Sequence, residues 1–266
     1  MIDLTGKVAL VTGGSRGIGA ATAKMLARVG ARVAFTYRAR QADAEAVAAT
    51  ISTQHPASSP LVLHADLSNP GECQRVVDDT VGEFGQLDIF VANAAIWPPD
   101  DVPVADMSPD RWRNTLGTNL DSVFFGTRAA LRAMSAPRRP RPSGVGWGRV
   151  VIVSSTAGQR GEAYHADYAA TKGAIIAFVK SVCVEAAPKG ITVNAVAPGW
   201  VDTEMSADAY NAGGGEGRGR IEKRIPLGHV ASPKDIAGPI VFLCSDLASG
   251  MTGEIVNVNG GSVLCG

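Results

Sequence analysis

The sequence predicts an α/β fold in which one doubly wound, seven-stranded parallel sheet is flanked by helices on both faces. Seven short apolar runs rich in β-branched residues recur along the 266 residues, and Ala-rich stretches of helical length separate them. The runs are nearly continuous rather than alternating, which is typical of parallel strands covered on both faces. A glycine-rich segment follows the first run, where a strand-to-helix turn is expected. The predicted strands are Val8–Val11, Val33–Phe35, Leu61–Leu63, Leu87–Val91, Val150–Val153, Ile191–Val196 and Ile255–Val258.

Helices are predicted in the intervals between these strands. Ser108 can cap a helix and Pro109 suits the first helical position, so the pattern after them predicts one helix that continues to about Met134. No stretch of linker composition interrupts the alternation of strand and helix, and we therefore expect a single domain that covers residues 1–266. Other predicted helices are Gly19–Val29, Gln41–Ile51, Arg75–Phe84 and Ala169–Ala187.

Two segments depart from this regular pattern. Residues 136–148 contain three prolines and three arginines, which predicts a basic, proline-rich loop insertion. Residues 203–224 include five glycines within seven residues, which predicts a mobile loop that closes over a substrate. Neither segment is long enough to form a domain of its own.

Charge and cysteine content exclude several classes of protein. The 25 basic and 25 acidic side chains balance to zero, so the chain has no electrostatic footprint for nucleic acid. No apolar run approaches the ~18–20 residues of a membrane span, and no secretory signal is visible, which predicts a cytoplasmic protein with no membrane partner. The four cysteines are far apart and form no metal-ligand pattern, so we expect reduced thiols and no metal site.

The segment Thr12–Gly19 (TGGSRGIG) predicts a nucleotide-binding turn. Glycines at 13, 17 and 19 allow a tight turn and a close approach of the backbone to a pyrophosphate, and the helix that follows offers free N–H groups to the anion. The position directly after the first strand of a βαβ unit makes this Rossmann-type interpretation much stronger than the glycines alone.

The same residues also fit a second motif, the nucleophile elbow of α/β-hydrolases. Gly13–Gly17 satisfies G-x-S-x-G, with Ser15 as the nucleophile. The elbow would lie before most of the sheet that normally precedes it, and His229 is the only histidine late enough in the chain to act as the base. A serine hydrolase is therefore a disfavoured alternative.

Three polar residues around residue 160 predict acid–base chemistry on an oxygen atom. Ser155 follows a predicted strand, and Tyr168 and Lys172 are four residues apart, on one face of a helix. A lysine ammonium near the phenol is expected to lower the pKa of Tyr168 toward the working range. The serine hydroxyl can hydrogen-bond the same substrate oxygen. Tyrosine and lysine at this spacing are common by chance, but here they occur together with the serine and the glycine-rich turn.

Taken together, these features resemble the classical short-chain dehydrogenase/reductase family over essentially the whole chain. Ser155 lies thirteen residues before Tyr168, the family's usual gap, so Ser155 rather than Ser154 is matched to the catalytic serine. The family's Asn-Ala-Gly after the fourth strand is Asn-Ala-Ala here, a mild departure. The matched segments are Thr12–Gly19, Asp66, Asn93–Ala95, Asn119, Ser155, Tyr168, Lys172, Pro198–Gly199, Thr203, Ile225–Gly228, Pro233, Asp235–Ala237 and Gly260–Gly261.

The resemblance implies a reversible reduction of a ketone to a secondary alcohol. A nicotinamide would deliver hydride to the carbonyl carbon, Tyr168 would donate the proton, and Ser155 would orient the oxygen. Lys172 would hold the nicotinamide ribose, and Asn119 would support a water that relays protons toward Lys172. The cofactor-binding residues implied by the turn and by the resemblance are Gly13, Ser15, Arg16, Gly17, Ile18, Gly19, Tyr37, Arg38, Asp66, Leu67, Asn93, Ala94, Tyr168, Lys172, Pro198, Gly199, Val201 and Thr203.

The end of the second predicted strand favours NADPH over NAD. An enzyme that prefers NAD needs an acidic residue there for the adenosine ribose, whereas residues 35–40 read FTYRAR. Arg38 is placed to pair with a 2′-phosphate, and Arg16 can approach it from the other side. The alternative is that Arg38 and Arg40 are solvated side chains at a helix start.

Substrate and partners are less well determined. The C-terminal pattern most resembles 3-oxoacyl-carrier-protein reductases, although relatives that act on sugars, steroids and polyketides share it. The resemblance implies that Arg138, Arg139 and Arg141 could dock an acidic carrier that holds an acyl thioester, but a solubilising loop whose charges face water is the favoured explanation. Relatives are usually homo-oligomers, so a tetramer or dimer is expected.

A non-catalytic, nucleotide-binding regulatory protein remains an alternative, which the complete set of serine, tyrosine and lysine disfavours.

Two further residues lie near the predicted site. Trp97 could form part of a pocket wall or pack within its loop. His165 is expected to be exposed at a helix start rather than to line the pocket.

Overall fold

A computed structural model describes residues 1–55, 59–136, 147–212 and 216–265. Its strands are β1 Val8–Val11, β2 Arg32–Tyr37, β3 Leu61–His64, β4 Ile89–Ala92, β5 Gly148–Val153, β6 Ile191–Pro198 and β7 Ile255–Val258. Its helices are α1 Gly17–Arg28, α2 Gln41–Gln54, α3 Pro70–Phe84, α4 Pro109–Leu116, α5 Ser122–Ser135, α6 Ala157–Arg160, α7 Ala166–Ala186, α8 Ala207–Asn211, α9 Gly217–Glu222 and α10 Pro233–Leu243, with short η1 Gly117–Asp121, η2 Ala187–Lys189, η3 Glu204–Ser206 and η4 Asp246–Ala248.

The seven strands form one parallel sheet in the order β3-β2-β1-β4-β5-β6-β7. The chain builds outward from β1 in one direction to β3 and then returns to β4 on the other side of β1. This reversal creates a topological switch point between β1 and β4, and ligands of open α/β sheets bind beside the carboxyl ends of the strands at such a point.

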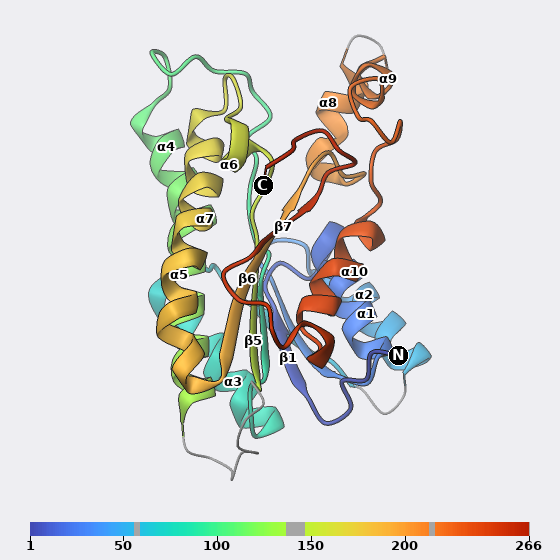
Figure 1. The fold of residues 1–266 in the computed structure, drawn as a ribbon, viewed down its shortest axis with the longest axis vertical. Coiled ribbons are helices and arrows are strands. Elements are labelled where there is room, and N and C mark those ends of the chain that lie inside the picture. Colours follow the sequence, from blue (N-terminus) through green and yellow to red (C-terminus); the bar gives the residue numbers. More distant parts are fainter. Residues whose placement is uncertain (56–58, 137–146, 213–215, 266) are drawn as a thin grey trace.

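Helices cover both faces of the sheet, as predicted. Figure 1 shows α3, α5 and α7 on one side of the sheet and α1, α2 and α10 on the other. Alternate residues of the strands face the two layers: Val150 and Ile152 of β5 belong to the core beneath α3, α5 and α7, whereas Val151 and Val153 belong to the core beneath α1, α2 and α10. Burial on both faces is the reason that the strands read as continuous apolar runs.

The helix after β3 starts earlier than its apolar pattern indicates. Asn69 caps α3 by accepting a hydrogen bond from the backbone N–H of Gly71 at 2.8 Å, and Pro70 occupies the first helical position. These signals place the start five residues before Arg75, where the predicted helix began. The helix ends at Gly85, which has a φ of 80°.

The prediction of one continuous helix from Pro109 to Met134 is wrong in its middle. The start is as expected, since the Ser108 hydroxyl accepts a hydrogen bond from the backbone N–H of Arg111 at 3.1 Å. A π-helical turn, η1, then separates α4 from α5. Such turns widen the backbone locally and occur often at functional sites. This one contains the buried side chain of Asn119.

The two irregular segments can be compared with the structure only in part. Nearly all of the proline-rich insertion at 136–148, including Arg138, Arg139 and Arg141, lies outside the described residues. The described part of 203–224 is helical, in η3, α8 and α9, rather than an open loop. Arg218 holds this segment together, because its guanidinium pairs with Asp202 at 2.9 Å and with Glu222 at 3.0 Å. Figure 1 shows α8 and α9 away from the helical layers, beside the C-terminal tail.

The described residues contain neither a membrane-spanning helix nor a metal-binding cluster. No helix among them is both long enough and apolar enough to cross a membrane. Within the same residues, no group of three or more His, Cys, Asp and Glu side chains could hold a metal ion.

Candidate active site

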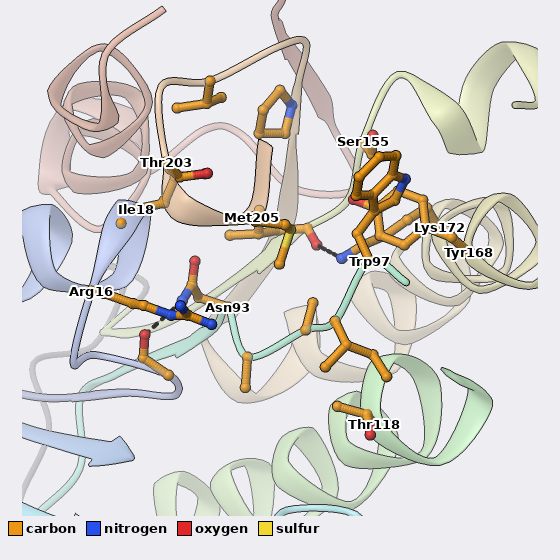
Figure 2. Close-up of a pocket in the computed structure, with 18 of the residues that line it drawn as sticks. Arg16, Ile18, Asn93, Trp97, Thr118, Ser155, Tyr168, Lys172, Thr203 and Met205 are labelled. Atoms are coloured by element: carbon orange, nitrogen blue, oxygen red, sulfur yellow. Dashed lines mark hydrogen bonds between the residues drawn. The ribbon is translucent and has the colours of Figure 1, made fainter. Parts of the chain in front are cut away.

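A cavity of about 330 Å³ lies at the carboxyl ends of the strands, beside the switch point. The predicted cofactor and catalytic residues line it, with two exceptions, Gly19 and Asn119. Figure 2 shows Ser155, Tyr168 and Lys172 together on one side of this cavity and Arg16 and Ile18 on the other. Residues that are up to 193 positions apart in the chain, from Gly13 to Ser206, therefore share one site, as the predicted sheet requires.

The glycine positions of the turn leave no room for a side chain. Gly13 has a φ of +66°, which glycine adopts without strain, and a Cβ there would lie 3.0 Å from the Cα of Ala94. Gly19 does not line the cavity; a Cβ at that position would meet the carbonyl oxygen of Gly13 at 2.1 Å. Gly19 therefore lets the first turn of α1 pack against the loop, which is a structural rather than a contact role.

Side chains of the neighbouring strands hold the turn in place. The Thr36 hydroxyl accepts a hydrogen bond from the N–H of Gly13 at 3.0 Å. The Thr12 hydroxyl accepts bonds from the N–H groups of Asn93 and Ala94 at 2.9 and 3.0 Å. In return, the Asn93 amide donates to the carbonyl oxygens of Thr12 and Gly13. Thr36 was not among the predicted site residues, although its position at the end of the second strand is a usable signal.

The end of the cavity near β2 is rich in positive charge. Arg16, Arg38 and Arg40 line it, and Asp66 is the acidic residue beside them. Arg38 lies 3.8 Å from the Asp66 carboxylate, but both side chains are about half exposed, so this pair is weak. The Ser68 hydroxyl also donates to Asp66 at 2.8 Å, and this hydrogen bond lowers the pKa of the carboxyl. Arg40 is paired with Asp43 at 3.4 Å.

Ser155, Tyr168 and Lys172 meet at the opposite end. The Ser155 side chain hydrogen-bonds to the Tyr168 hydroxyl, and the Lys172 ammonium lies 5.6 Å from the centre of the Tyr168 ring. The ammonium donates a hydrogen bond to the carbonyl oxygen of Val153 at 2.8 Å, which Figure 2 shows as a dashed line. The neighbouring Ser154 hydroxyl instead donates to the carbonyl oxygen of Lys172 at 2.8 Å, which joins β5 to α7.

The predicted lowering of the pKa of Tyr168 is not found. Burial raises the pKa of Tyr168 to about 12, and the Ser155 hydrogen bond only partly opposes this shift. Burial also lowers the pKa of Lys172 to about 8. Withdrawal of both groups from water outweighs the attraction between ammonium and phenolate that the spacing suggested. At neutral pH the phenol therefore keeps its proton.

Asn119 lies behind the cavity wall rather than in it. Its side chain is fully buried and forms two bonds of 2.8 Å with the backbone of Ile96, accepting from the N–H and donating to the carbonyl oxygen. The amide also reaches the Thr171 hydroxyl on α7 at 3.5 Å. Asn119 thus joins the π-helical turn to the loop after β4 and to the helix of Tyr168, which is a positioning role.

A second buried link holds the start of α7. The Asp167 carboxylate accepts hydrogen bonds from Arg111 at 3.1 Å and from the Thr115 hydroxyl at 2.8 Å. Arg111 also donates to the carbonyl oxygen of Asp100 at 2.8 Å. Because Asp167 directly precedes Tyr168, this ion pair fixes the helix that carries Tyr168 to α4. No sequence motif indicated it.

Aromatic rings form the wall of the cavity beyond Tyr168. The Trp97 ring stacks on His165 with centroids 4.5 Å apart and lies edge-on to Trp200 at 6.3 Å. The expectation that His165 is exposed is wrong: only 2% of it is accessible, because Trp97 covers one face and the Pro98 carbonyl oxygen lies 2.9 Å from Nε2. Trp97 itself lines the cavity.

The cavity lining is typical of a dinucleotide-binding site rather than of the active site of a serine hydrolase. Glycines cradle one end, exposed guanidinium groups lie near it, and a tyrosine with a serine and a lysine lies at the other end. None of the described residues that line the cavity is a histidine, so Ser15 has no base there. His229 instead is exposed, with its Nδ1 3.0 Å from the carbonyl oxygen of Leu227.

Known proteins resemble this chain over almost its full length. A family model described as Enoyl-(Acyl carrier protein) reductase matches residues 13–262. The 3-oxoacyl-(acyl-carrier-protein) reductase of Salmonella typhimurium is 39% identical over 263 residues, which cover 98% of this chain and 98% of that protein. A short-chain dehydrogenase/reductase from Serratia marcescens has a TM-score of 0.86 and 35% identity, and the match covers 97% of this chain and 98% of that one. The chain belongs to the short-chain dehydrogenase/reductase family.

Membership in the short-chain dehydrogenase/reductase family confirms the predicted fold and makes the chain an oxidoreductase that binds a nicotinamide cofactor. The hydrolase interpretation of residues 13–17 is therefore wrong. The family also includes relatives with other names: the glucose and ribitol dehydrogenase homolog of Oryza sativa subsp. japonica is 36% identical over 271 residues, 99% of this chain and 88% of that protein.

Proposed function

We propose that the protein reduces a ketone to a secondary alcohol with NADPH. The observation that carries this proposal is the joint lining of one cavity by the Ser155, Tyr168 and Lys172 side chains at one end and by the glycine-rich turn with two exposed arginines, Arg16 and Arg38, at the other. The cofactor would supply the hydride, and the chain supplies the groups that bind the substrate oxygen and give it a proton.

Tyr168 is the proton donor in this proposal. Because burial raises the pKa of Tyr168 to about 12, its hydroxyl carries a proton at neutral pH and is in the form that reduction requires. Ser155, hydrogen-bonded to the same hydroxyl, holds the ketone oxygen beside it. Lys172, whose ammonium is fixed by the Val153 carbonyl oxygen, binds the nicotinamide ribose and favours negative charge on the substrate oxygen. Asn119 fixes the loop and helix that carry these groups.

The experiment that tests this function follows NADPH absorbance with the purified protein. The substrates are small ketones, a 3-oxoacyl N-acetylcysteamine thioester and the same acyl group on an acyl carrier protein. We expect oxidation of NADPH with at least one ketone or 3-oxoacyl thioester. Binding of NADPH without turnover of any of them would favour the regulatory alternative.

The carrier-linked thioester is the finer part of the proposal. The 39% identical relative from Salmonella typhimurium is named a 3-oxoacyl-(acyl-carrier-protein) reductase, which supports this substrate. If Arg138, Arg139 and Arg141 dock the carrier, kcat/KM for the carrier-linked substrate exceeds that for the free thioester, and the advantage fades as ionic strength rises. Equal values for the two forms would leave a general ketone reductase.

Arg38 is proposed to select NADPH by pairing with its 2′-phosphate. We expect Arg38→Asp to shift the ratio of kcat/KM for NADPH and NADH at least tenfold toward NADH, because a carboxylate repels the phosphate and accepts hydrogen bonds from free ribose hydroxyls. Steady-state kinetics with both cofactors measure the ratio. Arg40→Asp is the comparison, and it should change the ratio much less, since Arg38 directly follows β2 whereas Arg40 lies at the start of α2 beside Asp43. An unchanged ratio in Arg38→Asp would leave the cofactor preference undecided.

We also propose a cytoplasmic homo-oligomer, a dimer or tetramer. The outer faces of α5 and α7 leave apolar side chains exposed: 46% of Phe124 and 70% of Val184 are accessible. Covering such side chains is a usual reason for association. The four cysteines are free thiols, which supports a reducing compartment. Light scattering of the purified protein measures the number of subunits.

A further inference from the structure

We call one part of the cavity lining the substrate end, and it consists of Ile96, Trp97, Glu162, Trp200 and Met205. These residues come from three separate loops, after β4, before α7 and after β6. Four of the five are apolar or aromatic, and Arg160, which also lines the cavity, forms no ion pair with Glu162, so the carboxylate among them needs an explanation. A purely apolar ketone would make no use of it.

Glu162 is partly buried at this position, and two side chains that can carry a positive charge, Arg160 and His165, lie near it without forming an ion pair with it. The Trp97 side chain hydrogen-bonds to the carboxylate, and the indole N–H can only be the donor. Among the described residues, no Lys, Arg or His lies within ion-pair distance of it; the ion pair nearest in sequence joins His165 to Asp101. Burial raises the pKa of Glu162, and the charges of His165 and Arg160 together with the Trp97 hydrogen bond only partly oppose this shift.

The Glu162 carboxylate also lies close enough to Tyr168 to influence its pKa electrostatically. Its charge contributes to the raised pKa of Tyr168. A carboxylate can accept about four hydrogen bonds, and the indole supplies one. The remaining acceptor sites belong to a group that lines the cavity, so a bound substrate is the partner that can satisfy them.

We propose, on the basis of the ketone reductase function above, that Glu162 is a specificity-determining residue that selects ketones carrying a hydrogen-bond donor, a hydroxyl or a protonated amine, close to the reacting carbonyl. A donor on the substrate completes the hydrogen bonding of the carboxylate. A substrate with a carboxylate at the same place is disfavoured by repulsion between like charges.

Matched substrates of similar size test this inference with the complete enzyme and NADPH. They are pentan-2-one, 4-hydroxybutan-2-one, 4-aminobutan-2-one and 3-oxobutanoate, which present a methyl, hydroxyl, ammonium or carboxylate group. In the unmodified enzyme we expect kcat/KM for the hydroxyl and ammonium compounds to exceed that for pentan-2-one by about tenfold or more, and 3-oxobutanoate to be the poorest substrate.

Glu162→Gln removes the charge and keeps the shape of the side chain. We expect it to reduce the preference for the ammonium compound at least tenfold, to reduce that for the hydroxyl compound several-fold, and to raise kcat/KM for 3-oxobutanoate. Turnover of pentan-2-one should persist, which shows that the variant is folded. Glu185→Gln, the same change on an exposed side chain of α7, is the control and should alter none of these ratios.

The two proposals fail in different ways. If pentan-2-one is reduced but Glu162→Gln leaves all the ratios unchanged, this inference is overturned and the reductase function stands. If the unmodified enzyme shows no preference for the donor-bearing ketones, the inference is likewise overturned. If no ketone and no 3-oxoacyl thioester oxidises NADPH, the reductase function itself is wrong, and the inference falls with it.

Discussion

Tyr168→Phe is expected to lower kcat for ketone reduction by at least a hundredfold. The phenol keeps its proton at neutral pH because burial raises the pKa of Tyr168 to about 12, and it is hydrogen-bonded to Ser155 within the cavity. Removal of the hydroxyl therefore removes the proton donor, and general acid catalysis contributes about 10²–10⁴ to a rate. Steady-state kinetics with NADPH and the best ketone measure the loss.

Cofactor binding should survive this change. The glycine-rich turn, Arg38 and Lys172 are untouched, so the Kd for NADPH, measured by fluorescence titration, should stay within a few-fold of that of the unmodified protein. Tyr164→Phe is a matched control, since Tyr164 is four residues earlier, 54% exposed and outside the cavity lining. The Tyr164→Phe variant should have normal activity. Retention of more than about a hundredth of kcat in Tyr168→Phe would remove Tyr168 from its proposed role.

Local patterns were sufficient to predict the sheet and the position of the site. All seven strands are found, because the five inner strands are buried on both faces and therefore read as continuous apolar runs, while the edge strands β3 and β7 are partly buried but keep the same apolar pattern. The glycine-rich turn was recognisable because only glycine fits where Gly19 packs against the Gly13 carbonyl oxygen. The parallel order of strands then brings the turn and the Tyr168 helix to one edge of the sheet.

Features that depend on long-range contacts could not be predicted. The π-helical turn is stabilised by bonds between Asn119 and the backbone of Ile96, which are 23 residues apart. Burial of His165 depends on a tryptophan from the loop after β4. The shifted pKa of Tyr168 follows from packing around the ring, whereas the four-residue spacing to Lys172 indicated only the attraction between the two groups.

We expect the buried ammonium of Lys172 to lower the free energy of unfolding of the protein. Only 3% of it is accessible, and burial lowers its pKa to about 8, which corresponds to a penalty of about 3 kcal/mol on the charged form at pH 7. Lys172→Met removes the charge but also the hydrogen bond to the Val153 carbonyl oxygen, worth about 1 kcal/mol. We therefore expect the cofactor-free variant to lose activity and to gain about 1–2 kcal/mol in its free energy of unfolding at pH 7, measured with urea.

The pH dependence of this gain separates a charge effect from better packing. Between pH 8 and about 10.5 the unfolded chain holds the lysine proton more tightly than the folded protein does, so the penalty on Lys172 shrinks and the unmodified protein becomes relatively more stable as pH rises. The advantage of Lys172→Met should accordingly fall by about 2 kcal/mol between pH 7 and pH 10. Lys180→Met, the same change on an exposed position of α7, should show no such trend. A gain in Lys172→Met that is constant across this range would mean that the ammonium is not penalised by burial, and the low pKa assigned to Lys172 would be wrong.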